Sequence, residues 1–210
     1  MNIQSSFDNL LKIIIVGDSG VGKSNFLFRF VNDQFSQVYQ TTVGIDCKSK
    51  VCTLPKSKKK VKLNLWDTAG QERYMSINKL YFQKIQGVIL MYDITHRDSF
   101  EGLAKWVQLI NETTYNIPVI LIGNKIDDEE ENRIVRTEEG KDFAKQNGYL
   151  FYEASALSGK NVNNAIYDLC ECIISSLEFS TFSVNISGST LDYLSNNVEK
   201  KHKLRNEKCC

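Results

Sequence analysis

Short apolar runs recur along the chain and predict the strands of a sheet. Residues 10–16 and 87–93 are apolar at nearly every position, whereas residues 61–66 alternate between apolar and polar side chains. Unbroken apolar runs are typical of strands that are buried on both faces of a sheet. The expected strands are 10–16, 43–54, 61–66, 87–93, 118–123 and 150–153.

Segments with helical spacing of apolar residues separate these strands. Helices are expected at 25–31, from an N-cap at Asp98, at 137–147 and from about Asn161. The second would place on one face Phe100, Leu103, Val107 and Ile110, and the last would place on one stripe Val162, Ala165, Ile166, Leu169, Cys170 and Ile173. Strands that alternate with helices predict an α/β fold with a mostly parallel central sheet flanked by helices.

The chain divides by composition into one domain and a tail. Residues 8–178 carry the strand and helix patterns, whereas residues 179–210 are rich in Ser, Asn and Thr and then basic. The tail has too few large apolar residues for a core, so we expect it to be flexible. No apolar stretch is long enough to span a bilayer, and no signal peptide is visible.

Charge and cysteine content narrow the function classes. The net charge of +1 argues against a nucleic-acid binder, because no basic excess is spread over the domain. The six cysteines lack disulfide-like or metal-site spacing, which favours reduced thiols in the cytosol.

The sequence Gly-Asp-Ser-Gly-Val-Gly-Lys-Ser at 17–24 lies between an expected strand and an expected helix. In that context the pattern G-x-x-x-x-G-K-[ST] predicts a loop whose backbone N–H groups and lysine surround phosphates, with the serine hydroxyl on a magnesium ion. The residues expected to contact the nucleotide here are Ser19, Gly20, Val21, Gly22, Lys23, Ser24 and Asn25.

Further polar residues follow other strands. Asp67 could reach the magnesium ion through water, Gly70 offers a backbone N–H to the γ-phosphate, and Gln71 could orient an attacking water. Because ligands of parallel sheets bind beyond the carboxyl ends of the strands, these residues and the phosphate loop should lie together.

The segment Asn124-Lys125-Ile126-Asp127 predicts base recognition. A carboxylate that accepts two hydrogen bonds suits guanine, whereas adenine presents the opposite polarity. Ser155 and Ala156 could add a backbone N–H to the guanine oxygen. Phe35 could cover the base or fill the core, and the sequence leaves both open.

In this order, the segments 17–24, 67–70, 124–127 and 155–156 resemble the motifs of Ras-like small GTPases, which are P-loop NTPases. Residues 66–74 (Trp-Asp-Thr-Ala-Gly-Gln-Glu-Arg-Tyr), residues 42–46 and the terminal Cys209-Cys210 resemble the Rab family in particular. The resemblance covers about residues 10–177. It implies a GDP/GTP switch that hydrolyses GTP and regulates vesicle traffic.

The resemblance also implies residue roles. Thr42 would join Ser24 and Asp67 at Mg²⁺, Gln71 would be catalytic, and Leu157 would lie beside the base. Residues 35–46 and 67–82 would be the switch segments.

Partners and location are implied in the same way. An exchange factor, a GTPase-activating protein, effectors, a Rab escort protein and a GDP dissociation inhibitor are expected. Geranylgeranyl groups on Cys209 and Cys210 would anchor the protein to the cytoplasmic face of intracellular membranes, from which it would cycle to the cytosol.

The chain departs from the usual Rab pattern at several positions. Cys47 replaces a phenylalanine of the effector surface, unless it faces the core, and Leu157 replaces a lysine. Gln83-Lys84-Ile85 replaces Arg-Gly-Ala. The basic hairpin at 55–60 could be a solvated tip or could touch an acidic membrane.

Two other classes of protein carry a phosphate loop of this kind and compete with a GTPase switch. A module that binds GTP with little or no hydrolysis is disfavoured by the intact Gln71. A small-molecule P-loop kinase is disfavoured by the guanine-type segment at 124–127.

Overall fold

The computed structural model describes residues 7–36, 42, 44–68, 82–128 and 132–186, with side chains up to Phe179. Six strands form one sheet in the order β2-β3-β1-β4-β5-β6. Their bounds are β1 Asn9–Val16, β2 Ile45–Thr53, β3 Lys60–Thr68, β4 Gly87–Asp93, β5 Val119–Asn124 and β6 Leu150–Ala154. The helices are α1 Lys23–Asn32, α3 Arg97–Glu101, α4 Leu103–Thr113, α6 Thr137–Asn147, α7 Val162–Ile186 and the 3₁₀ turn η2 Ile126–Asp128.

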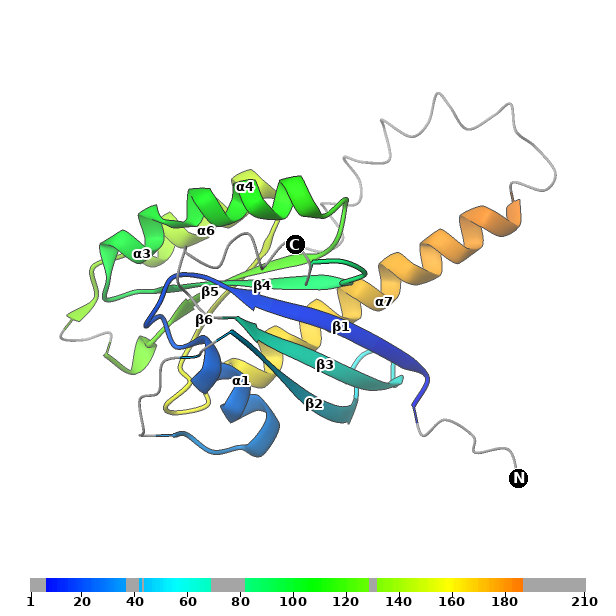
Figure 1. Ribbon diagram of the computed structural model, residues 1–210, viewed down its shortest axis with the longest axis horizontal. Coiled ribbons are helices and arrows are strands. Elements are labelled where there is room, and N and C mark those ends of the chain that lie inside the picture. Colours follow the sequence, from blue (N-terminus) through cyan, green and yellow to red (C-terminus); the bar gives the residue numbers. More distant parts are fainter. Residues whose placement is uncertain (1–6, 37–41, 43, 69–81, 129–131, 187–210) are drawn as a thin grey trace.

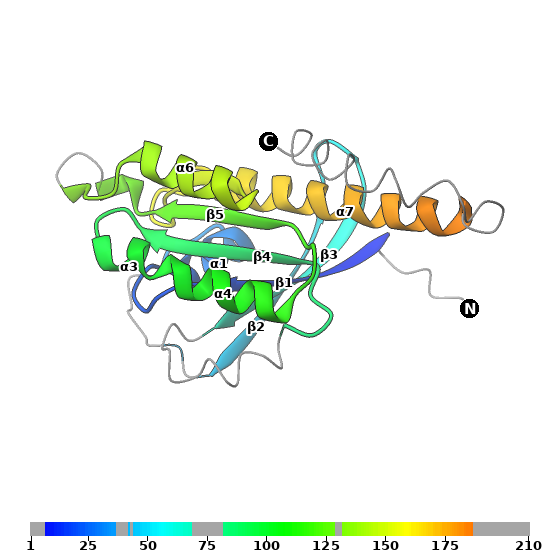
Figure 2. The same ribbon diagram turned by 90° about the horizontal axis from the view of Figure 1, so that it is seen from above.

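The sheet is mostly parallel, as the sequence predicts. Only β2 runs antiparallel, because a hairpin joins it to β3. Helices α1 and α7 lie on one face of the sheet, and α3, α4 and α6 lie on the other (Figures 1 and 2). Each face has its own hydrophobic core, the first around Phe26, Phe30 and Leu169 and the second around Tyr92, Trp106 and Leu121. The carboxyl ends of the parallel strands therefore meet at one edge of the sheet.

The helix predicted after β4 is wrong in its start, although its four predicted apolar residues do pack against one core. Helix α3 begins at Arg97 with His96 as N-cap, so Asp98 lies inside the first turn. The helix therefore begins two residues earlier than predicted, and the Ser99 hydroxyl and N–H both donate to the carbonyl oxygen of His96, at 2.7 and 3.1 Å. The helix is then interrupted at Gly102, and α4 buries Leu103, Trp106, Leu109 and Ile110, whereas Phe100 and Val107 are only partly buried.

The last helix carries the predicted apolar stripe, since all six expected residues are buried. Helix α7 continues to Ile186, so the expected border between domain and tail falls within a helix. No helix in the described part of the chain is long and apolar enough to cross a membrane.

The basic hairpin between β2 and β3 packs against α7. The backbone N–H groups of Lys56 and Ser57 both donate to the Glu171 carboxylate, at 2.8 and 3.0 Å. The Lys56 side chain pairs with Asp168, and the Lys59 side chain pairs with Glu178. Acidic residues of α7 thus neutralise two of the lysines, a contact that neither interpretation of the sequence included.

Candidate functional site

The loop after β1 turns sharply into α1, and glycines make the turn possible. A Cβ on Gly17, which has φ of 144°, would lie 2.2 Å from the carbonyl oxygen of Met91. Gly22 is the N-cap of α1 with φ of 97°, a conformation that favours glycine. Ser19 and Gly20 are exposed at the tip, Val21 is buried, and Asn25 lies half-buried in the first turn of α1. The helix α1 therefore begins at the end of this loop, with its N-terminus next to the loop.

Lys23 is folded back under this loop. Its ammonium donates to the carbonyl oxygens of Gly17 and Asp18, both at 2.8 Å. Burial lowers the pKa of Lys23 to about 8, although the carboxylates of Asp67 and Asp18 oppose this shift. A buried cation at a helix N-terminus provides a local field that favours an anion.

Three oxygen-bearing side chains converge beside Lys23. The hydroxyls of Ser24 and Thr42 are 2.8 Å apart, although the two residues come from α1 and from the segment before β2. Asp67, near the end of β3, is only 2% exposed, and its Oδ1 makes no hydrogen bond with any residue that the structure describes. Burial raises the pKa of the Asp67 carboxyl, and the nearby Ser24 hydroxyl and Lys23 offset part of that rise.

This donor set fits Mg²⁺. The ion prefers a small number of carboxylate and hydroxyl oxygens and keeps several waters. A buried carboxylate oxygen without a partner is costly, and a bound cation or its water would satisfy it.

Asn124 joins the phosphate loop to the loop after β6. Its amide nitrogen donates to the Val21 carbonyl oxygen at 2.8 Å, and its amide oxygen accepts from the Ala156 N–H at 3.2 Å. Asn124 is 1% exposed, so both ends of the amide are used inside the protein. It therefore positions the two loops.

The other expected base-binding residues lie around the same point. Asp127 is exposed on η2, and its carboxylate accepts a hydrogen bond from the buried Ser155 hydroxyl. Leu157 is 47% exposed at the rim. Phe35 is partly buried and packs against the core on the α1 face of the sheet. This position favours the interpretation that it fills the core.

Arg29 of α1 holds the loop after β6 by hydrogen bonds to two of its carbonyl oxygens. Its Nε donates to the Ala156 carbonyl oxygen at 3.0 Å and its Nη2 donates to that of Leu157 at 2.5 Å. Sequence reasoning missed this residue, because its partner in the loop after β6 lies 127 residues away along the chain.

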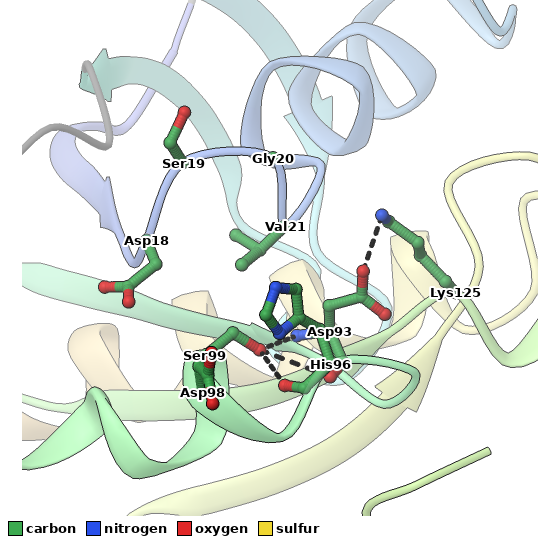
Figure 3. A pocket seen from close by; sticks show the side chains of 9 residues that line it. All are labelled: Asp18, Ser19, Gly20, Val21, Asp93, His96, Asp98, Ser99 and Lys125. Atoms are coloured by element: carbon green, nitrogen blue, oxygen red, sulfur yellow. Dashed lines mark hydrogen bonds and ion pairs between the residues drawn. The ribbon is translucent and has the colours of Figure 1, made fainter. Parts of the chain in front are cut away.

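Lys125 has φ of 73° and forms an ion pair with Asp93, the last residue of β4, with its Nζ 2.5 Å from Oδ2. Asp93 is 5% exposed and also accepts from the Thr95 hydroxyl at 2.7 Å. Both residues border a cavity of about 360 Å³ between the phosphate loop and α3 (Figure 3). Its lining consists of Asp18, Ser19, Gly20, Val21, Asp93, His96, Asp98, Ser99 and Lys125.

Asp18 ties the phosphate loop to α4. It accepts from the Trp106 indole N–H at 2.7 Å and pairs with Lys105 at 2.9 Å. A Cβ on Gly102 would lie 2.6 Å from the Asp18 carboxylate, which explains a glycine at the junction of α3 and α4. Neither Asp18 nor Trp106 was singled out from the sequence.

The structure thus brings together the predicted residues of the phosphate loop, the side chains of Thr42 and Asp67, and the predicted residues of the two loops that follow β5 and β6. Gly70, Gln71, Cys209 and Cys210 lie outside the described residues, so their predicted roles stay predictions.

The sequence is similar to those of known proteins. Residues 12–175 match the sequence model of the Ras family. The chain is 46% identical over 169 residues to Ras-related protein Rab-3B of Bos taurus, covering 80% of this chain and 76% of the relative. It is 41% identical over 176 residues to Ras-related protein Rab-10 of Caenorhabditis elegans, covering 83% and 86%. Identity to Ras-related protein Rab-3A of Homo sapiens is 44% over 169 residues, covering 80% and 76%.

A phosphate loop at the carboxyl edge of a six-stranded, mostly parallel sheet, together with the family match, defines a small GTPase of the P-loop class. The chain belongs to the Ras family and, within it, to the Rab proteins. It is a Rab-like GTPase that binds GDP and GTP, hydrolyses GTP and takes part in membrane traffic.

Proposed function

We propose that the carboxyl edge of the sheet is a single guanine-nucleotide site with a phosphate half and a base half. The phosphate half is the loop with Lys23, and the base half is Asp127 with the loop from Ser155 to Leu157. The single observation that carries this proposal is the Asn124 amide, which contacts Val21 in the first half and Ala156 in the second. A bridge between the two loops suits one ligand that contacts both of them.

In the phosphate half, the N–H groups of residues 19–25 and the Lys23 ammonium would neutralise the β- and γ-phosphates. A polyphosphate would return the Lys23 pKa toward its ordinary value, because it replaces the solvation that burial removes. Ser24, Thr42 and Asp67 would hold Mg²⁺. When bound, the ion would neutralise charge on the phosphate oxygens.

In the base half, the Asp127 carboxylate would accept from the N1–H and the exocyclic amine of guanine. The Ser155 hydroxyl orients that carboxylate. The Ala156 N–H already donates to Asn124, at a rather long 3.2 Å, so its contact with the guanine oxygen would be a shared one. Adenine would leave the carboxylate unpaired, which is a strong source of discrimination.

The contact between Ser24 and Thr42 supports a switch. Thr42 lies in the segment before β2, and its hydroxyl contacts that of Ser24 in α1. A γ-phosphate would favour this arrangement, and GDP would favour it less, so the segment would report which nucleotide is bound.

Gln71 is proposed to orient the attacking water. Replacing it with leucine removes the amide but keeps similar bulk, so hydrolysis should fall while GTP binding persists. A single-turnover assay of GTP-loaded protein, with and without an activating protein, measures this. Hydrolysis at the wild-type rate in the Gln71→Leu variant would refute the role, and a wild-type protein that never hydrolyses GTP would favour the binding-module alternative.

Relatives of the Rab type imply regulators and effectors in general. We propose that these include an exchange factor, a GTPase-activating protein, a Rab escort protein and a GDP dissociation inhibitor. Co-purification of the tagged protein in its GDP-bound and GTP-bound forms tests this. Identical partner sets for the two forms would contradict it.

The tail is proposed to anchor the protein to the cytoplasmic face of intracellular membranes. Two lipids suffice for stable anchoring, and the basic residues at 200–208 would add attraction to an anionic leaflet. Mass spectrometry of the cellular protein should find geranylgeranyl on Cys209 and Cys210, and microscopy should place the protein on organelle membranes. A membrane-bound protein with unmodified cysteines would contradict this assignment.

A further inference from the structure

The segment that joins β5 to α6 carries residues important to the proposed base site at both of its ends. Asp127 lies on η2 at the start, and Arg133 lies close to the start of α6. The Ile134 and Val135 N–H groups both donate to the Ile94 carbonyl oxygen at 2.9 Å. These two bonds fix the α6 end of the segment to the residue that follows β4.

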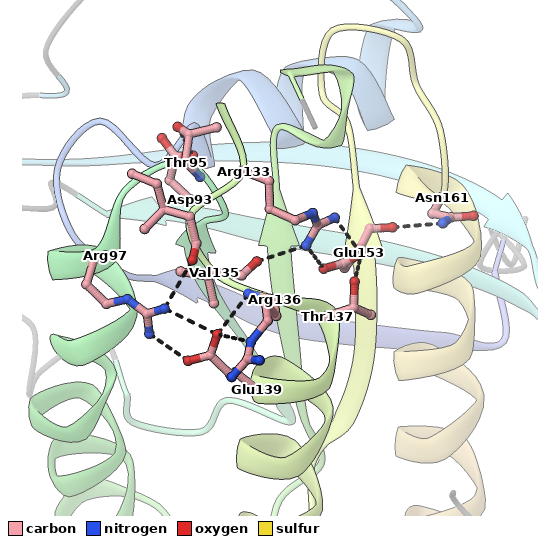
Figure 4. Close-up of polar contacts among 11 residues, drawn as sticks. Asp93, Thr95, Arg97, Arg133, Val135, Arg136, Thr137, Glu139, Glu153 and Asn161 are labelled. Atoms are coloured by element: carbon pink, nitrogen blue, oxygen red, sulfur yellow. Dashed lines mark hydrogen bonds and ion pairs between the residues drawn. The ribbon is translucent and has the colours of Figure 1, made fainter. Parts of the chain in front are cut away.

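Arg133 forms a bidentate ion pair with Glu153 of β6 (Figure 4). Its Nη1 and Nη2 lie 2.8 and 3.0 Å from the two carboxylate oxygens. Each side chain is only 15% exposed. Arg133 also donates to the Val135 carbonyl oxygen at 2.9 Å, and the Thr137 hydroxyl donates to Glu153 at 3.0 Å. The pair is geometrically well defined and shielded from solvent, so removal of one charge leaves the other poorly compensated.

Glu153 is also linked to the loop that follows it. Ala154 ends β6, and Ser155 then donates its hydroxyl to the Asp127 carboxylate. On the other side, the Asn161 side chain donates to the Glu153 backbone oxygen at 2.7 Å. Asp127 is therefore bonded to Ser155, directly after β6, and Arg133 is bonded to Glu153 within β6.

A second arginine–glutamate pair on the same side of the sheet provides a comparison. Arg97 contacts both oxygens of Glu139, at 2.8 and 3.2 Å, and joins α3 to α6. It has the same bidentate form and contacts the α6 end of the same segment, through the Ile134 carbonyl oxygen at 3.1 Å and the Arg136 N–H at 2.9 Å, but neither residue contacts β6 or Ser155 in the described part of the chain. Figure 4 shows both pairs in one view.

We propose that Arg133 and Glu153 are positioning residues for guanine selectivity. The pair holds the Asp127 carboxylate in register with the Ser155 hydroxyl, so that the carboxylate meets both N–H donors of guanine. The inference rests on the proposed base site. Weakening the ion pair would therefore reduce the affinity for guanine nucleotides most, because guanine donates two hydrogen bonds to the carboxylate. It would reduce the affinity for hypoxanthine nucleotides less, because hypoxanthine lacks the 2-amino group.

The experiment compares the dissociation of GDP and IDP from the full-length protein. The variants are Glu153→Gln and Arg133→Lys, the second of which keeps the charge but not the bidentate geometry. Both should release GDP faster and reduce the preference for GDP over IDP by about tenfold, the effect of one lost charged hydrogen bond. Glu139→Gln is the control, because it weakens a bidentate pair that contacts the same segment without reaching β6, and it should keep the wild-type preference.

Melting temperatures of the GDP-bound proteins separate positioning from general stability. A variant that melts earlier but keeps the wild-type ratio of GDP to IDP affinity would show that the pair is only structural, and would overturn the inference. If Glu153→Gln does not fold, Arg133→Lys decides alone. A wild-type protein that does not prefer GDP to IDP would overturn the proposed base site and this inference with it.

Discussion

The Asn124 amide nitrogen lies 2.8 Å from the Val21 carbonyl oxygen, across 103 residues of sequence. This contact joins the loop proposed for the phosphates to the loops proposed for the base. The Gly22 backbone passes so close that a Cβ there would lie 2.4 Å from the same amide nitrogen. The phosphate loop and the end of β5 are therefore closely packed against each other.

Replacing Asn124 with alanine should weaken GDP binding by about 30-fold or more. Val21 would lose its donor and Ala156 its acceptor, and each unsatisfied buried group costs about 1–3 kcal/mol. The dissociation constant of GDP measures the effect. Gln108→Ala, at an exposed position of α4, is the control and should leave the affinity for GDP unchanged. Equal affinities in the two variants would contradict the bridging role of Asn124.

Gly17→Ala should destabilise the fold far more than Gly20→Ala. The added Cβ would meet the Met91 carbonyl oxygen at 2.2 Å in the first case, whereas it meets nothing within 4 Å in the second. Gly20 has φ of 81°, so its alanine variant still carries a strain of about 1–2 kcal/mol. Thermal unfolding of both variants tests the ranking, and a Gly17→Ala protein that is as stable as Gly20→Ala would refute it.

Stability should depend on pH through Glu139. The hydrogen bond from Arg97, followed by the Arg136 N–H, lowers the pKa of Glu139 to about 2. A lowered folded-state pKa stabilises the protein above the ordinary value of 4.5, and this contribution is lost as pH falls from 4.5 toward 2.

Glu139→Gln should therefore lower the melting temperature at pH 7, and its difference from wild type should shrink below pH 4.5. Glu138→Gln is the control, because Glu138 forms no ion pair within the described part of the chain. A difference that stays constant down to pH 3 would contradict the assignment.

The strands and the position of the site could be predicted because both depend on local patterns. Strands buried on both faces, such as β4, are apolar throughout, and the site residues follow strand ends that parallel pairing gathers at one edge. The start of the helix after β4 and its break at Gly102 were not predicted, because the close approach of Gly102 to the Asp18 side chain arises only in the folded chain.

The contacts that support the site could not be predicted in this way. Arg29 reaches Ala156 and Arg133 reaches Glu153 only once the helices and strands are placed. Arginines and glutamates are common on exposed helix faces, so nothing in their sequence neighbourhood marks them as partners.

Cys47 is exposed on β2 and lies directly across from Trp66 of β3, so the alternative that it faces the core is wrong. By the Rab resemblance, an aromatic residue here joins Trp66 in the surface that effectors contact. An aromatic residue contributes about 2–4 kcal/mol at an interface hot spot. We therefore hypothesise that Cys47→Phe strengthens binding to common Rab effectors and weakens binding to the native partner, with GTP affinity unchanged.

Titrations of wild type and Cys47→Phe, both loaded with a non-hydrolysable GTP analogue, against one effector of each kind would test this hypothesis. Ser49→Ala, two residues along the same exposed face, is a control of small size change. Equal affinities of wild type and Cys47→Phe for both effectors would remove Cys47 from the recognition surface.

The exchange of Asp127 for asparagine tests the central claim, guanine recognition by this carboxylate, most directly. An amide reverses one hydrogen-bond polarity, so the variant should prefer xanthine nucleotides, with a change in the ratio of XTP to GTP affinity of about 100-fold or more. Asp128→Asn, at the neighbouring exposed aspartate, should keep the wild-type ratio. The measurement is competition of GTP and XTP for each purified protein. A shift toward XTP in Asp127→Asn alone is the predicted result, and unchanged GTP selectivity in that variant would contradict the account.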